Sequence, residues 1–249
     1  MTVPTQMLTD VLIIGGGLGG VAAALAAVEG GASVVMVEGD RWLGGQLTAQ
    51  AVPSDEHMWS EQFGVTASYR RVRDGIRRYY RDNYPLTAAA RSREWLNPGG
   101  GFVSPLCHEP RVAVAVLEAM LAPWRASGRL TVLQSYRLVC AESDADVVRA
   151  VTVVDVRGGD QVVIEAAYVL DATETGELLP AAGVEYVTGF ESAKETGEPS
   201  APPKRNRPIC RASRGASPWT TSTATTPSIG LRRTTTGGRL VRRTGRVRS

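Results

Sequence analysis

The sequence is short of cysteine and has no long apolar run, and both absences narrow the class of protein. Its three cysteines, Cys107, Cys140 and Cys210, form no C-x-x-C pair and no zinc-binding pattern. We therefore predict a reducing, cytoplasmic compartment and no metal site. No apolar run approaches the roughly 18 residues that span a membrane. No basic residue precedes Asp10, which argues against a signal peptide.

The net charge of +3 conceals an uneven distribution along the chain. Residues 204–249 contain twelve basic residues and no acidic residue, so this segment carries +12. Because the whole chain carries +3, residues 1–203 carry −9. Its 249 residues, 43% hydrophobic and 21% charged, suit a globular protein with one large domain or two small ones. We predict a folded part, 1–203, and a basic tail, 204–249.

The most informative stretch covers residues 10–38. An apolar run is followed by a glycine turn, a helix of small residues and a second apolar run that ends in a carboxylate. This order predicts a buried parallel strand, a tight turn, a helix and a second parallel strand. The turn carries the pattern G-x-G-x-x-G at Gly15, Gly17 and Gly20, which is the fingerprint of dinucleotide-binding domains.

Each residue of the fingerprint has a physical role. Gly15 allows the tight turn, Gly17 lets the backbone approach a pyrophosphate, and Gly20 lets the helix pack closely. The helix N-terminus offers free N–H groups and a positive dipole end to phosphates. Glu38 lies 18 positions after Gly20, close to the spacing expected for the acid that binds a ribose. A glycine-rich turn in another α/β protein is the alternative, but it leaves Glu38 unexplained.

The segment that follows Glu38 distinguishes between cofactors. It has the sequence G-D-R-W-L-G-G-Q-L-T over residues 39–48, with Gly44-Gly45 after a short basic segment. This arrangement resembles the flavin-binding enzymes of the glutathione-reductase superfamily, in which the Gly-Gly loop passes close to the cofactor. Only a backbone without side chains comes that close. A plain NAD-binding domain has no such use for this loop, so the resemblance favours FAD.

The rest of the chain predicts further helices and strands. We expect a leader over residues 1–9 and a long loop over 85–110. Helices are predicted over 65–84 and over 110–121, and the second helix ends before Pro123. We also predict a strand over 130–133, a hairpin formed by 147–156 and 161–164, and a separate buried strand over 167–171.

The predicted helix over 65–84 is strongly basic. Its apolar residues recur at helical spacing and form one stripe: Tyr69, Val72, Ile76, Tyr80 and Tyr84. Its six arginines are interpreted as a solvated helix face. A face for an anionic substrate or partner is the alternative.

Residues 171–178 carry the second informative motif, D-A-T-E-T-G-E-L. It resembles a second flavin-contacting signature of the superfamily, a strand ending in Ala-Thr-Gly, with the glycine displaced here to Gly176. A strand that ends beside the first turn lies at the carboxyl edge of the sheet, where nucleotides bind. We therefore expect Thr173 near the phosphates.

Together these motifs resemble bacterial FAD-dependent oxidoreductases of the glutathione-reductase superfamily, over residues 8–200. The resemblance implies an α/β fold: a Rossmann-like FAD-binding domain with a parallel sheet of the ββα type, an inserted β-hairpin and a helical segment. It also implies FAD as the cofactor and a small-molecule substrate as partner. The cofactor-binding residues that it implies are Gly15, Gly17 and Gly20 at the pyrophosphate, Glu38 at the adenosine ribose, Arg41, Gly44, Gly45 and Gln46 along the cofactor, and Thr173 near the phosphates.

The resemblance ends near residue 203. Members of the superfamily continue with a substrate domain and a last flavin motif containing a Gly-Asp aspartate, and neither is found here. Residues 204–249 have no apolar periodicity. They are a basic tail that binds nucleic acid or a membrane surface, a linker, or an out-of-frame translation of a G+C-rich gene. We favour the third hypothesis and predict a disordered tail without nucleic-acid or membrane partners.

The sequence assigns no catalytic residue. Cys107-His108 is a candidate for a nucleophile and base or a flavin attachment point, but adjacent side chains seldom face each other. His57 is a candidate acid or base on the substrate side. The leading hypothesis is an FAD-dependent oxidoreductase present as its N-terminal portion. The alternatives are a non-catalytic fragment that binds FAD weakly or not at all, and a nucleic-acid binder that uses the basic tail.

Overall fold

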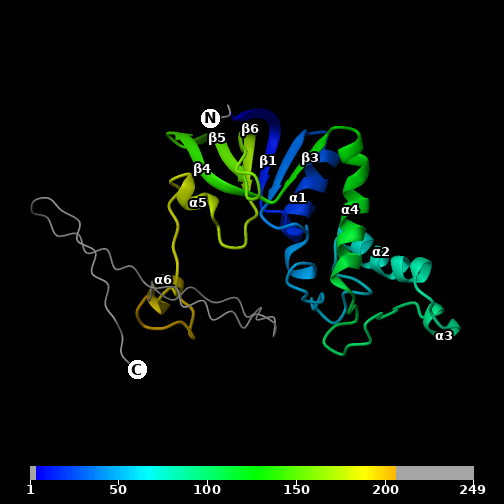
Figure 1. The fold of residues 1–249 in the computed structure, drawn as a ribbon. Coiled ribbons are helices and arrows are strands. Elements are labelled where there is room, and N and C mark those ends of the chain that lie inside the picture. The colour runs from blue at the N-terminus through cyan, green and yellow to red at the C-terminus, as the bar shows by residue number, and fades with distance from the viewer. Residues whose placement is uncertain (1–3, 206–249) are drawn as a thin grey trace, which may run out of the picture. The chain divides into compact units, whose positions relative to one another are not determined.

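The computed structural model describes residues 4–205, and six strands within this range form one sheet (Figure 1). The strand order is β3-β2-β1-β6-β5-β4. The first four strands in this order pair in parallel, whereas β5 pairs antiparallel with both of its neighbours, β6 and β4. The strands are β1 (Thr5–Ile14), β2 (Val34–Glu38), β3 (Leu130–Gln134), β4 (Tyr136–Asp144), β5 (Val147–Asp155) and β6 (Gln161–Asp171).

Helices cover one face of the parallel strands. This layer consists of α1 (Leu18–Glu29), α2 (Ala67–Asn83) and α4 (Pro110–Ala126). The other helices of the described residues are the short α3 (Ala88–Arg91), α5 (Leu178–Ala181) and α6 (Ala193–Thr196) and a 3-10 helix, η1 (Gly45–Leu47). The main core joins α1, α2 and α4 to Ile13, Met36 and Leu130 of the sheet. Within residues 4–205, no helix has both the length and the apolar character needed to cross a bilayer.

The other face of the sheet is covered by the sheet itself. Leu12 of β1, Val35 of β2 and Ile164 of β6 pack in one cluster with Val151 and Val153 of β5. The two edge strands, β3 and β4, are separated in the chain by a single residue, Ser135, which is buried and has a φ of 64°. The sheet must therefore curl until its edges meet at this corner. The corner brings the start of β4 over the carboxyl end of β2.

The strands differ from the prediction in three ways. Residues 161–164 and 167–171 were predicted as two strands, but they belong to one continuous strand, β6, which pairs with β1 on one side and β5 on the other. The antiparallel hairpin is thus part of the main sheet. Strand β4 was not predicted. Strand β1 begins at Thr5, within the expected leader, because its first residues pair with Val162 and its neighbours in β6.

Helix α4 continues past the predicted stop. Pro123 lies inside it, and the helix ends at Ala126. A proline lacks the N–H that would bond to the preceding turn. Leu121 is fully buried, however, and Trp124 packs against the same core, so tertiary packing overrides the local preference. The predicted loop over 85–110 also contains the short helix α3, whose first turn is capped by the Thr87 hydroxyl.

Helix α2 confirms the apolar stripe but corrects the interpretation of its arginines. Val72, Ile76 and Tyr80 are buried. Two of the six arginines, Arg73 and Arg77, are 0% and 1% exposed. The prediction of a solvated face is therefore wrong for these two residues.

A carboxylate compensates both buried arginines. The Glu61 side chain, 9% exposed, pairs with Arg73 and with Arg77. Arg73 also bonds to Ser54 and to Glu56, and the Arg77 Nε donates to the Leu96 carbonyl. Arg73 and Arg77 thus attach the irregular segments around residues 54–61 and 94–96 to α2. A buried charge persists only with partners of this kind.

Candidate functional site

The glycine turn, residues 15–20, is fixed against both neighbouring strands. The Gly15 N–H donates to the Val37 carbonyl of β2 at 2.8 Å, and the Ala172 N–H donates to the Ile14 carbonyl at 2.7 Å. Gly15 has a φ of +105°, and a Cβ there would lie 2.3 Å from the Ala172 carbonyl oxygen. Only glycine fits this position.

Gly20 and Gly17 differ in whether packing within the fold requires a glycine. A Cβ at Gly20 would lie 2.0 Å from the Gly15 carbonyl oxygen, so packing of α1 against the turn itself requires a glycine. A Cβ at Gly17 would meet only the end of the Glu174 side chain, at 3.1 Å. Gly17 also has an ordinary φ of −59°. The fold therefore does not require a glycine at position 17, and the space above it is open to a ligand.

Glu38 stabilises the turn from the end of β2. One carboxylate oxygen accepts a 2.6 Å hydrogen bond from the Gly16 N–H, and the other accepts one of 2.8 Å from the Asp40 N–H. Each carboxylate oxygen has two lone pairs, so both retain capacity for another donor.

The Gly44-Gly45 segment packs onto the glycine turn. The Gly44 N–H donates to the Gly16 carbonyl at 2.8 Å. Gly44 has a φ of +103°, and a Cβ there would lie 2.6 Å from the Leu117 side chain, so its position is determined by the core. Gly45 lies against the turn, because a Cβ on it would be 3.3 Å from the Gly17 Cα.

The 171–178 motif forms a closed loop organised by Asp171. One Asp171 oxygen accepts from the Thr173 N–H at 3.0 Å and from its hydroxyl at 2.7 Å, and the other accepts from the Leu178 N–H at 3.1 Å. The Glu177 N–H donates to the Thr173 hydroxyl at 2.9 Å. Gly176, with a φ of +70°, allows the chain to turn back. The motif thus positions Ala172 and Thr173 beside the glycine turn.

Replacement of Asp171 by alanine is expected to lower the free energy of unfolding by about 2 kcal/mol, because hydrogen bonds to a charged acceptor are lost. Urea denaturation would measure the change. Asp171→Asn retains one acceptor oxygen and should recover part of the loss. Equal stability of Asp171→Ala and the parent would contradict this role.

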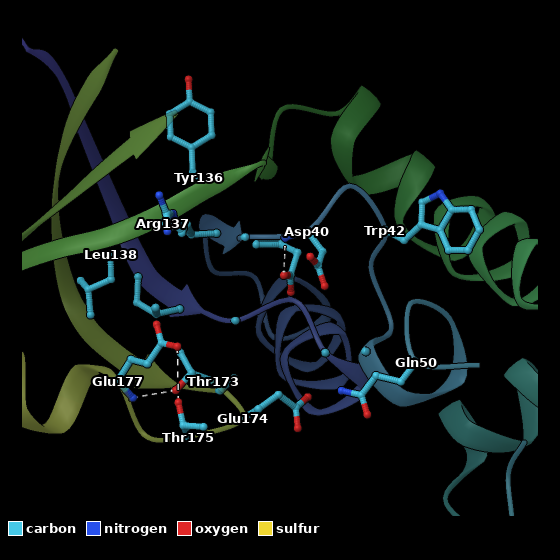
Figure 2. A pocket seen from close by; sticks show the side chains of 18 residues that line it. Asp40, Trp42, Gln50, Tyr136, Arg137, Leu138, Thr173, Glu174, Thr175 and Glu177 are labelled. Carbon is cyan, nitrogen blue, oxygen red and sulfur yellow. Dashed lines mark hydrogen bonds between the residues drawn. The ribbon is translucent and has the colours of Figure 1, made fainter. Parts of the chain in front are cut away.

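A cavity of about 310 Å³, here named the glycine cleft, opens where these segments meet (Figure 2). Its walls come from the glycine turn, the end of β2, the start of β4 and the loop after β6. They include Ile14, Gly15, Gly17, Val37, Glu38, Gly39, Asp40, Trp42, Gly45, Gln50, Tyr136, Arg137, Leu138, Ala172, Thr173, Glu174, Thr175 and Glu177.

The structure brings together five of the nine predicted cofactor-binding residues. Gly15, Gly17, Glu38, Gly45 and Thr173 line the glycine cleft. The other four do not line it. Gly20 and Gly44 are buried behind it, Arg41 is exposed, and Gln46 lines an adjoining cavity of about 380 Å³.

Sequence reasoning missed the wall formed by Tyr136, Arg137 and Leu138. These residues begin β4, and the corner at Ser135 places them beside Gly39. A Cβ added to Gly39 would lie 3.7 Å from the Arg137 side chain. The alternation of apolar and polar residues at 136–138 was an available signal for a strand. Nothing local indicated that this strand would reach the end of β2.

The candidate catalytic residues lie elsewhere. The Cys107 thiol bonds to the Ser104 carbonyl at 3.6 Å, and His108 Nδ1 bonds to the Leu106 carbonyl at 3.1 Å. Neither residue lines the glycine cleft. His57 is exposed and lines a third cavity, of about 500 Å³, together with Asp55 and Glu56. Among residues 4–205, no three His, Cys, Asp or Glu side chains are grouped as a metal site.

Fold and site together define a dinucleotide-binding domain of Rossmann type: a parallel βαβ unit, a glycine turn, and an acid at the end of the second strand. The chain belongs to the FAD-dependent oxidoreductase family, whose model matches residues 10–241. This match confirms the predicted FAD-dependent oxidoreductase and FAD as its cofactor, whereas membership of the glutathione-reductase superfamily stays a prediction. The matched range extends into the segment predicted as a basic tail. No curated protein matches the chain.

Solved structures with similar folds are distant in sequence. L-proline dehydrogenase from P. horikoshii has 18% identity and a TM-score of 0.39, with 70% of this chain and 24% of that chain covered. A geranylgeranyl bacteriochlorophyll reductase-like protein from Thermoplasma acidophilum has 17% identity and a TM-score of 0.43, covering 72% and 43%. THI4 from Thermovibrio ammonificans has 19% identity and a TM-score of 0.45, covering 80% and 76%. The chain thus spans under half the length of the first two proteins.

Proposed function

We propose that this chain binds FAD in the glycine cleft and forms the cofactor-binding part of an oxidoreductase. The observation that carries this proposal is the open space at Gly17. Packing requires glycine at Gly15 and Gly20, whereas position 17 faces only a movable side chain. A glycine that the fold does not need, at the N-terminus of a helix, suits the close approach of a pyrophosphate.

The cofactor is proposed to follow the walls of the cleft. Its adenosine lies between Glu38 and the start of β4, where Val37 and Leu138 supply apolar surface and Glu38 accepts from the ribose hydroxyls. Its pyrophosphate lies over Gly17, with Thr173 close by. Its flavin extends past Gly45 into the adjoining cavity, which contains Gln46 and shares Glu174 with the glycine cleft. The proposed contact of Arg41 remains a prediction.

When bound, FAD would supply the redox chemistry. The protein's contribution is binding and orientation: N–H groups and a helix dipole for the phosphates, a carboxylate for the ribose, and a backbone-lined path for the flavin. The cavity that contains His57 shares Asp55 and Glu56 with the adjoining cavity that contains Gln46. We propose this joined region as the substrate side of the site.

Purification of the full chain tests the proposal directly. A flavin absorbance band after purification, or quenching of flavin fluorescence on titration with FAD, is the expected result. A folded chain that neither retains nor binds FAD would contradict it.

The second candidate is a non-catalytic domain that retains FAD weakly. Four acidic side chains line the glycine cleft, Glu38, Asp40, Glu174 and Glu177, against one basic side chain, Arg137. Such a cleft opposes a dianionic pyrophosphate. Reduction of the bound flavin by a substrate, observed as loss of its visible absorbance band, would distinguish an enzyme from a binding domain.

Glu38 is expected to select against a 2′-phosphate on the adenosine ribose, because the two negative charges repel. FAD and NAD should therefore bind at least about tenfold more tightly than NADP. Isothermal titration with the three nucleotides measures the difference. A clear preference for NADP would refute the assignment of Glu38.

A further inference from the structure

The carboxylate of Glu174 lies inside the space that the glycine turn leaves open. Its Oε1 is the nearest atom to the ideal Cβ positions of both Gly17 and Gly45, at 3.1 Å in each case. Glu174 lines both the glycine cleft and the adjoining cavity that contains Gln46. Figure 2 shows its side chain extending from the loop after β6 toward the side chain of Gln50. The carboxylate is thus at the boundary between the two cavities.

This boundary is also where the fold attracts an anion. Gly17 is the N-cap of α1, and within the described residues the first turn of this helix has no side-chain cap and no acidic residue. Its N–H groups and the positive end of its dipole favour a negative charge. Glu174 supplies such a charge from another part of the chain.

A bound pyrophosphate would need the same space. Space is available beside Gly17 because this residue lacks a Cβ, and a carboxylate oxygen of Glu174 lies in that space. Two anions at this separation repel each other, and Arg137 is the single basic residue in the cleft lining. Glu174 is exposed, so its side chain has room to rotate away when a ligand enters.

We propose that Glu174 competes with the pyrophosphate of FAD for the N-terminus of α1 and thereby sets how weakly the chain retains its cofactor. This inference rests on the proposed function, because it concerns the same cleft. Glu174 acts as an internal substitute for the phosphates in the free protein. It is displaced, at the expense of affinity, when FAD binds.

The test is the variant Glu174→Gln, which keeps the size of the side chain and removes its charge. Its affinity for FAD and for ADP should rise about tenfold, because a charge facing the phosphates is lost. Its affinity for adenosine, which has no phosphate, should not change. Flavin fluorescence and isothermal titration calorimetry provide the dissociation constants.

Glu177→Gln is the matched control. Glu177 lines the same cleft from the same loop, and the side-chain hydrogen bond of its carboxylate is a long one of 3.4 Å to Thr175. Glu174, and not Glu177, approaches the Cβ positions of Gly17 and Gly45, so replacement of Glu177 should raise FAD affinity by less than about threefold, a smaller gain than for Glu174→Gln.

The outcomes separate this inference from the proposed function. If the parent binds FAD and Glu174→Gln binds it equally or less tightly, the competition is refuted and the proposed site stands. An equal gain for adenosine would also refute it, because the effect would not depend on the phosphates. If neither folded protein binds FAD or ADP, the proposed function and this inference both fail.

Discussion

Replacement of Gly17 by valine is expected to reduce FAD affinity at least about 100-fold while leaving the fold intact. The new side chain would occupy the space proposed for the pyrophosphate, and loss of two charge-assisted hydrogen bonds accounts for this magnitude. The fold should tolerate the change, because the backbone at Gly17 is ordinary and its only close neighbour is the end of Glu174. The free energy of unfolding should change by less than about 1 kcal/mol.

Gly20→Ala is the contrasting control. An alanine in a helix interior is normally more stable than a glycine by about 1 kcal/mol. Here its Cβ would lie 2.0 Å from the Gly15 carbonyl oxygen, so stability should fall by about 3 kcal/mol or more. Urea denaturation and FAD titration of both variants test the distinction. Unchanged FAD affinity in Gly17→Val would show that the ligand does not reach this position.

Replacement of Glu61 by glutamine is expected to lower the free energy of unfolding by about 3 kcal/mol. Glu61 is the shared carboxylate partner of the buried Arg73 and Arg77. Removal of one partner from a buried ion pair leaves an uncompensated charge, which is costly. Urea denaturation measures the loss. Glu29→Gln is the control, because Glu29 pairs with Arg71 at the surface and should contribute less than about 1 kcal/mol.

The contribution of Glu61 to the free energy of unfolding should depend on pH. Burial is the largest single influence and raises the pKa of Glu61, but the hydrogen bonds and charges of Arg77 and Arg73 together outweigh it and hold this pKa below its ordinary value of 4.5. A carboxyl whose pKa is lowered by folding stabilises the protein above its unfolded pKa. The difference between parent and Glu61→Gln should therefore be constant above about pH 5 and diminish as the pH falls through the folded pKa. A difference that grows on acidification would contradict the ion pair.

The same buried arginines connect the core to the site. Arg73 bonds to Ser54 and Glu56, and Glu56 lines both the cavity that contains Gln46 and the cavity that contains His57. The irregular segment around residues 54–61 is thus held by a charge network rather than by secondary structure. Long loops fixed in this way often carry binding residues.

The amino-acid sequence predicts those parts of the site that depend on local backbone geometry. The glycine fingerprint, the acid at the end of β2 and the loop organised by Asp171 each follow from residues close together in the chain. Their conformations are decided by short-range sterics and local hydrogen bonds, such as the positive φ at Gly15 and the bonds from Asp171 to Thr173. A pattern of residues encodes such geometry directly.

The distant segments that meet around that site could not be predicted from local patterns. The curl of the sheet at Ser135 brings Tyr136 to the end of β2, and the burial of Arg73 depends on Glu61 from another segment. Both depend on the packing of a whole sheet face or helix face. An arginine in a helix pattern has the same periodicity whether it faces water or a buried carboxylate. The difference arises from the partner, which is supplied only when the chain folds.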